Sequence, residues 1–181
     1  MLNSFDHKKK RLFRKSKPFI RPFSMDDLWV FWAAYKEGSF DIPADMEKDA
    51  FYDRMLNDLS KYSSTLVVED YNRRFKGKRG VICVISIDSA GTRIEPQVQF
   101  FKWATKSNIL RANVRFFNWV RYSKQVGVCV VRCLRGTANL FHHVKNYGVI
   151  YYVGKIVGGD PQGRGDEFIF STRGKFGQEK S

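Results

Sequence analysis

Apolar side chains in the first third of the sequence recur at helical spacing. Ser24 is a suitable N-cap for a first helix, and Gly38 is a suitable end for it. A second helix is predicted over residues 44–62. The apolar stripes of the two helices, which we predict to be core, consist of Leu28, Phe31, Trp32 and Tyr35 in the first and Met46, Phe51, Met55, Leu56 and Leu59 in the second.

The pattern changes after the second helix to short apolar runs rich in β-branched residues, which are typical of strands. Two further helices, over residues 107–123 and 137–147, interrupt these runs. The predicted strands cover residues 65–68, 81–87, 94–103, 126–134, 149–157 and 167–172. This order of elements predicts one α+β domain built on a largely antiparallel sheet.

The composition of the chain excludes several classes of protein. With 43% hydrophobic and 15% aromatic residues, the chain can form a packed core and is not globally disordered. No apolar run reaches the roughly 18 residues needed to cross a bilayer, and no apolar segment typical of a signal peptide follows the basic N-terminus. Three cysteines fit a reducing compartment, so we expect a cytoplasmic protein or one inside a virion or nucleoprotein particle.

The net charge of +14 is unevenly distributed. Residues 1–23 hold eight basic side chains and one acid, residues 24–61 hold four basic and nine acidic ones, and residues 62–181 hold twenty basic and eight acidic ones. We therefore divide the chain into a basic arm (1–23), a domain (24–172) and a polar tail (173–181). The arm and a basic connection at 72–80 are candidate contacts for nucleic acid or partner proteins, with solvated segments as the alternative, through Lys8, Lys9, Lys10, Arg11, Arg14, Lys15, Lys17, Arg21, Arg73, Arg74, Lys76, Lys78 and Arg79.

A local motif near the C-terminus has a counterpart in a known family. The stretch Val144-Lys145-Asn146-Tyr147-Gly148-Val149 stands where GNAT acyl-CoA N-acyltransferases carry Tyr-x-x-x-Gly-Phe, and Tyr152-Val153-Gly154 resembles the x-Val-Gly that follows. Together with the order of elements, residues 24–172 resemble this superfamily. The resemblance implies a mixed, largely antiparallel sheet flanked by helices and, for an active member, acetyl-CoA as the cofactor.

Two departures from the family motifs concern its chemistry. The family's glycine-rich pyrophosphate loop corresponds to residues 102–108, which contain no glycine, and we expect Trp103 to crowd a phosphate there. The remaining anion-binding candidates are Lys106, Ser107 and Asn108. Val144 replaces the family's tyrosine acid, so the candidates for a catalytic acid are Tyr122, His142, His143 and Tyr147, with structural or surface histidines as the alternative.

No metal site is predicted, because Cys129 and Cys133 lie four residues apart on a strand and are expected to be core. From charge and resemblance together we expect a non-catalytic GNAT-like docking component of a virion or another nucleoprotein particle, without a cofactor. Its partners would be protein subunits and DNA or RNA, and no membrane. The alternatives are an acetyl-CoA-dependent N-acetyltransferase and a free nucleic-acid-binding module.

Overall fold

The fold is of the predicted α+β class. The computed structural model describes residues 19–70, 81–90 and 92–174. Its strands form a sheet in the order β1-β2-β3-β4-β5-β7-β6. The pairs β1–β2, β2–β3, β5–β7 and β6–β7 are antiparallel, whereas β4 and β5 are parallel. A mixed, largely antiparallel sheet with helices is therefore confirmed.

The elements follow the predicted order, with one strand added at the start. The first part of the chain contains β1 (Phe19–Pro22), a 3-10 turn η1 (Met25–Asp27), α2 (Leu28–Lys36), α3 (Lys48–Ser60), β2 (Ser64–Asp70) and β3 (Val81–Ala90). The rest contains β4 (Arg93–Gln99), α4 (Lys106–Tyr122), β5 (Val128–Leu134), α5 (Arg135–Lys145), β6 (Tyr151–Ile156) and β7 (Glu167–Arg173).

The described residues divide into two compact units. The first unit comprises residues 19–70, 81–88 and 97–109, and the second comprises residues 89–90, 92–96 and 110–174.

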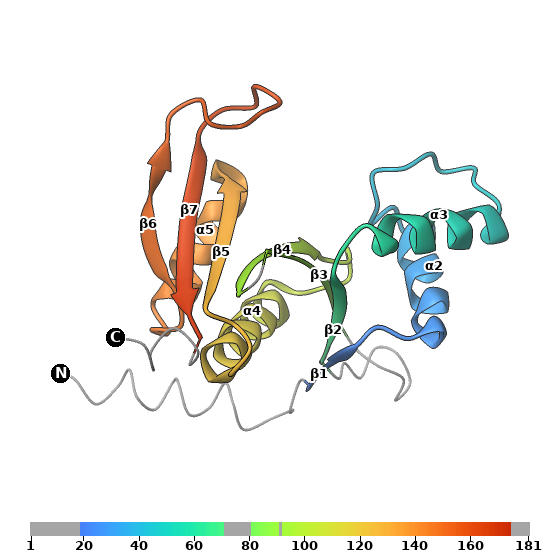
Figure 1. Cartoon of the computed structure of the whole chain (residues 1–181). Helices are drawn as coiled ribbons and strands as arrows, with labels where there is room; N and C mark the ends of the chain where they lie inside the picture. The colour runs from blue at the N-terminus through green and yellow to red at the C-terminus, as the bar shows by residue number, and fades with distance from the viewer. Residues whose placement is uncertain (1–18, 71–80, 91, 175–181) are drawn as a thin grey trace. The chain divides into compact units, whose positions relative to one another are not determined.

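The core of the first unit is aromatic. Phe31 and Tyr35 of α2, Phe51 of α3 and Phe101 are all buried, and they form one cluster with Val67 of β2. Figure 1 shows α2 and α3 lying next to each other. The predicted apolar stripes are thus confirmed as core, apart from Leu56, which is half-buried and outside this cluster.

Helix α3 begins four residues later than the predicted start at residue 44. The Tyr35 hydroxyl donates to the Pro43 carbonyl oxygen at 2.5 Å and accepts from the Met46 amide at 2.8 Å. These bonds hold residues 43–46 in a non-helical connection, and the following Glu47 is still extended. A long-range contact therefore overrides the local helical pattern.

The second unit packs two helices against a three-stranded antiparallel layer. Figure 1 shows β5, β7 and β6 side by side with α5 next to them. Phe141 of α5 contacts Phe117 of α4 at 6.1 Å and Phe170 of β7 at 5.5 Å between ring centroids. All three rings are buried. This contact chain forms the core of the second unit.

The loop between β6 and β7 is held by ion pairs. Arg164 donates to both carboxylate oxygens of Asp160 at 2.9 Å, and these hydrogen bonds lower the pKa of Asp160 to about 2. Lys155 contacts Asp166 at 2.9 Å. Four charged side chains thus connect the loop to itself and to β6.

Two helix-end glycines give a matched test of backbone strain. Gly38, just after α2, has φ +69°, so Gly38→Ala should lower the free energy of unfolding by about 1 kcal/mol. Gly136 lies inside α5 with nothing near an added Cβ, so Gly136→Ala should raise it by up to about 1 kcal/mol. Urea unfolding of both variants checks the signs. Equal shifts in one direction would contradict the assignment.

Candidate functional site

The start of α4 presents exposed polar groups in the first unit. Lys106 and Ser107 are exposed, and the first amide groups of a helix have no acceptor within the helix. The Thr105 hydroxyl accepts from the Asn108 amide at 3.2 Å and so acts as the N-cap. Of the three predicted anion-binding residues, Asn108 is buried, and its backbone amide already donates to Thr105. Lys106 and Ser107 are exposed and therefore accessible to a ligand.

Trp103 lies differently from the expectation that it would crowd this segment. Its ring centroid is 5.0 Å from that of Phe101, and it packs against the core cluster of the first unit. The Trp103 side chain therefore takes part in the core of the first unit. The preceding Lys102 also lies away from a phosphate at this segment, because its Nζ is beside Gly38, at the C-terminal end of α2, where a helix carries partial negative charge.

The donor groups at the start of α4 fit a coenzyme phosphate, although this segment has no glycine loop. Lys106 supplies a cation, and the exposed amides at the start of α4 supply donors and the positive end of the helix dipole. Thr105 already occupies one amide, so fewer backbone donors face a phosphate than in an uncapped helix. If CoA binds, Lys106 and Ser107 are the residues that would hold its phosphates.

The parallel ladder between β4 and β5 is short. Among the described residues it consists of the pairs Arg93–Val128 and Ile94–Cys129, both in the second unit. On its other edge, β5 pairs with β7 along all seven residues to Leu134. After Cys129, no further described residue of β5 pairs with β4 in this ladder. An extended ligand with amide groups can bind to such an edge by strand-like pairing.

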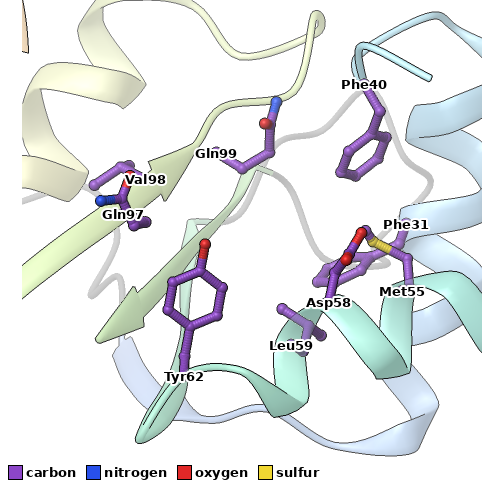
Figure 2. Close-up of a pocket in the computed structure, with 9 residues that line it drawn as sticks. All are labelled: Phe31, Phe40, Met55, Asp58, Leu59, Tyr62, Gln97, Val98 and Gln99. Carbon is purple, nitrogen blue, oxygen red and sulfur yellow. The ribbon is translucent and has the colours of Figure 1, made fainter. Parts of the chain in front are cut away.

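A pocket of about 260 Å³ lies within the first unit. Figure 2 shows Phe31 of α2 and Met55, Asp58 and Leu59 of α3 on one side, with Gln99 of β4 and Phe40 above them. The described residues that line it are Phe31, Phe40, Met55, Asp58, Leu59, Tyr62, Gln97, Val98 and Gln99. It is an apolar cavity with a carboxylate, a phenol and amide groups, which is the usual composition of a small-molecule site.

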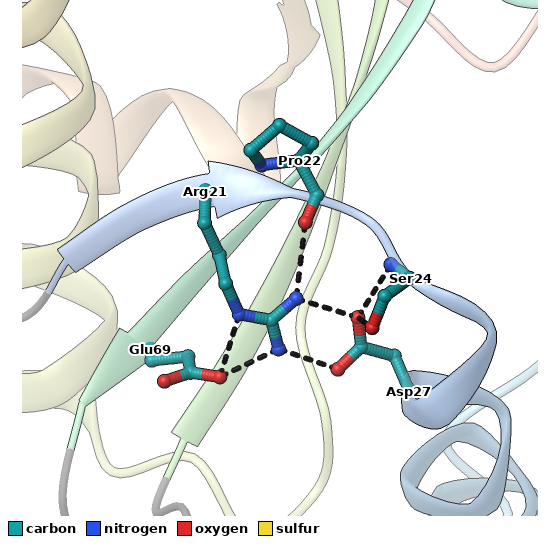
Figure 3. Close-up of polar contacts among 5 residues, drawn as sticks. All are labelled: Arg21, Pro22, Ser24, Asp27 and Glu69. Atoms are coloured by element: carbon teal, nitrogen blue, oxygen red, sulfur yellow. Dashed lines mark hydrogen bonds and ion pairs between the residues drawn. The ribbon is translucent and has the colours of Figure 1, made fainter.

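Arg21, a predicted partner contact, is engaged within the first unit. Its guanidinium donates to Asp27 at 2.5 and 2.7 Å and to Glu69 at 2.6 and 2.9 Å (Figure 3). Arg21 lies in β1, inside the segment predicted as an arm, and Glu69 is in the neighbouring strand β2. Both carboxylates compete with any external phosphate for the Arg21 guanidinium, and its contact with a partner stays a prediction.

The other predicted cationic contacts lie outside the described residues. They are Lys8, Lys9, Lys10, Arg11, Arg14, Lys15 and Lys17 in the arm and Arg73, Arg74, Lys76, Lys78 and Arg79 in the connection after β2. Their contacts with nucleic acid or partners stay predictions.

The four candidates for a catalytic acid belong to the second unit. His142 packs its ring 5.3 Å from Tyr152 and 5.0 Å from Phe170 between centroids. His143 and Tyr122 are exposed, and Tyr147 is half-buried in the turn after α5. Val144, at the family's tyrosine position, is fully buried, so this position provides neither a proton nor access.

Cys129 and Cys133 are free thiols on β5. Burial raises the pKa of the Cys129 thiol and raises that of Cys133 to about 11. Within the part of the chain that the structure describes, no group of three or more metal-ligating side chains comes together. Nor does any helix there have the length and apolar character required to cross a membrane.

Sequence reasoning missed the polar residues of the pocket. Phe31, Met55 and Leu59 were placed correctly in the apolar stripes, but the stripes alone do not show that a cavity remains between them. Asp58 and Tyr62 lie near the end of α3 and belong to no motif. A signal was present in the charge pattern, because residues 24–61 carry a net charge of −5 in a strongly basic chain.

Comparison with solved structures identifies the fold. A GNAT-family acetyltransferase from Streptococcus pneumoniae aligns with 87% of this chain and 99% of its own, at 14% identity and a TM-score of 0.57. Spermidine N-acetyltransferase from Vibrio cholerae, solved with CoA and spermine, covers 88% and 97% at 12% identity and a TM-score of 0.60. Ribosomal-protein-alanine N-acetyltransferase from Brucella melitensis covers 86% and 99% at 14% identity and a TM-score of 0.51.

No model of a protein family matches the sequence, and no curated protein matches it. The chain therefore has the fold of the GNAT acetyltransferases at low sequence identity, and the predicted resemblance is confirmed at the level of the fold.

Proposed function

We propose that this protein is an acetyl-CoA-dependent N-acetyltransferase. The observation that carries the proposal is the likeness of nearly the whole chain to acetyltransferases, one of them bound to CoA. The reaction class is transfer of an acetyl group from a thioester to an amine, with the proton lost by nitrogen ending on the released thiol. This reverses the preference drawn from the sequence, where the missing glycines and Val144 favoured a non-catalytic role.

The chain's own residues support coenzyme binding through charge. Lys106 and the amides of Lys106 and Ser107 form an exposed, positively charged helix start. Since one helix amide is already capped by Thr105, we expect the affinity for CoA to depend strongly on the Lys106 charge.

Thermal shift with acetyl-CoA tests the proposal. At a coenzyme concentration 100-fold above the dissociation constant, the native state should gain about 2.7 kcal/mol. Lys106→Glu places a negative charge where the phosphates would bind, so the dissociation constant should rise at least about tenfold. Lys124→Glu is the matched control, because Lys124 is an exposed lysine just past the other end of α4.

Each protein is compared with its own melting temperature without coenzyme, which separates binding from any change in stability. Absence of a shift at millimolar acetyl-CoA would contradict the proposal and return the non-catalytic docking role to first place. Equal loss of binding in both lysine variants would reject Lys106 as a phosphate ligand.

A further inference from the structure

We infer that the pocket of the first unit binds a small primary amine that carries one positive charge and a benzene-sized apolar group. The inference rests on the proposed function in one respect only, because that function would make this amine the acetyl acceptor. The binding itself depends on the pocket residues alone.

The size and walls of the pocket indicate the apolar part of the ligand. An apolar cavity of about 150 Å³ accommodates benzene. The volume here, about 260 Å³, therefore leaves room for one ring and a short aliphatic arm. Phe31, Phe40, Met55 and Leu59 form apolar walls, and the rings of Phe31 and Phe40 lie 6.3 Å apart between centroids. Aromatic and thioether surfaces of this kind favour a flat apolar ligand.

The polar residues of the pocket indicate a cationic group. Figure 2 shows the Asp58 carboxylate and the Tyr62 hydroxyl projecting from α3 and its end toward the same space. The Gln99 amide nitrogen donates to the Ser39 and Phe100 carbonyl oxygens at 2.8 and 2.9 Å, so its oxygen is the group with acceptor capacity toward a ligand. A carboxylate, aromatic faces and an amide oxygen stabilise an ammonium group.

The present partners of Asp58 do not prevent this. Lys61 contacts its Oδ1 at 2.6 Å and Arg54 its Oδ2 at 3.8 Å, and both cations are more than 40% exposed. Exposed pairs of this spacing on a helix contribute little to stability, because water screens both charges and ordering two long side chains costs entropy. A ligand ammonium that is partly withdrawn from water can therefore displace them.

The surrounding charge favours a cation at this place in the chain. The whole protein carries +14, which disfavours a cationic ligand, but residues 24–61 carry nine acids and four bases. Exposed acids on α3 and on the connection before it include Asp45, Glu47, Asp49 and Asp53. This local negative region raises the concentration of cations near the pocket and disfavours carboxylate ligands.

The number of positive charges also follows from the lining. Among the described residues that line the pocket, Asp58 is the carboxylate, and the opposite walls are apolar. A second ammonium would lie among Phe31, Met55 and Leu59 without a counter-charge, which is costly. A monoamine is therefore favoured over a polyamine.

Titration calorimetry of the full chain without coenzyme tests the inference, with 2-phenylethylamine as the probe. We expect saturable binding, at least tenfold weaker binding in Asp58→Asn, and unchanged binding in Asp53→Asn, an exposed acid on the same helix. Phe40→Ala should also weaken binding. Melting temperatures of the free variants confirm that each is folded, and Tyr62→Phe provides a second, milder change in the polar lining.

Three results would overturn the inference. One is binding of 3-phenylpropionate, the anionic counterpart, as tight as that of the amine. Another is an equal effect of the Asp58 and Asp53 variants. The third is tighter binding of spermidine that Asp58→Asn abolishes. Amine binding without release of thiol from acetyl-CoA would defeat the proposed function and leave the pocket assignment intact, whereas stabilisation by acetyl-CoA without amine binding would do the reverse.

Discussion

Asp27→Asn should destabilise the protein by about 3 kcal/mol, because it breaks a buried ion cluster while leaving its partners in place. Asp27 is fully buried, and its carboxylate accepts from the Arg21 guanidinium at 2.5 and 2.7 Å and from the Ser24 amide at 2.9 Å. An asparagine of the same shape keeps one acceptor, but its amide hydrogens face the donors of Arg21. Urea unfolding measures the loss.

The control is the neighbouring carboxylate. Asp26 is exposed in the same first turn, so Asp26→Asn should cost at most a few tenths of a kcal/mol through the helix dipole. If the two substitutions have equal effects, the cluster is not what stabilises this end of the first unit. High salt should change the difference little, because screening acts weakly on buried pairs.

The same cluster predicts a pH dependence. Burial opposes ionisation of Asp27, but the hydrogen bonds from Arg21 and Ser24 outweigh it, so the pKa of Asp27 is lowered on folding. The stability that this group contributes is therefore fully present above the ordinary aspartate pKa of about 3.9 and is lost as the pH falls through the lower value of the folded state. Acid unfolding of wild type and Asp27→Asn should converge in that range.

The cluster also shows what the sequence could and could not predict. Ser24 correctly predicted a helix start, because capping is a local effect. The role of Arg21 depends on Glu69, which lies 48 residues away, and on the pairing of β1 with β2. In the sequence, Arg21 has the same appearance as the arm cations before it, so only the strand pairing distinguishes it.

The candidate site, too, was only partly predictable from the sequence. The helix that begins at the candidate anion-binding residues Lys106 and Ser107 was predicted, because helix starts are visible in the sequence. The packing of Trp103 against Phe101 and the cavity beside Asp58 were not, since both depend on how side chains from α2, α3 and β4 fill space. Periodicity predicts which side of a helix is buried but not whether that burial is complete.

The aromatic core of the first unit contacts the wall of the pocket through Phe51 and Phe40. Phe51→Ala should lower the free energy of unfolding by about 3–5 kcal/mol, the usual cost of removing a buried phenylalanine ring. Phe51 is fully buried, stacks on Tyr35 at 4.8 Å and contacts Phe40 at 5.8 Å between ring centroids. Because Phe40 also lines the pocket, the cavity left by Phe51 should loosen one of its walls.

Two further variants distinguish the loss of core packing at Phe51 from a general sensitivity of the helices to substitution. Trp29→Ala removes a larger ring from α2, but Trp29 is 47% exposed, so the loss should stay well below that of Phe51→Ala. Phe51→Leu retains most of the volume and should recover more than half of the stability. In the amine titration, Phe51→Ala should weaken binding more than Trp29→Ala does, because Phe51 contacts a lining residue and Trp29 is not among those that line the cavity. Equal weakening in the two variants would show that the pocket does not depend on this core.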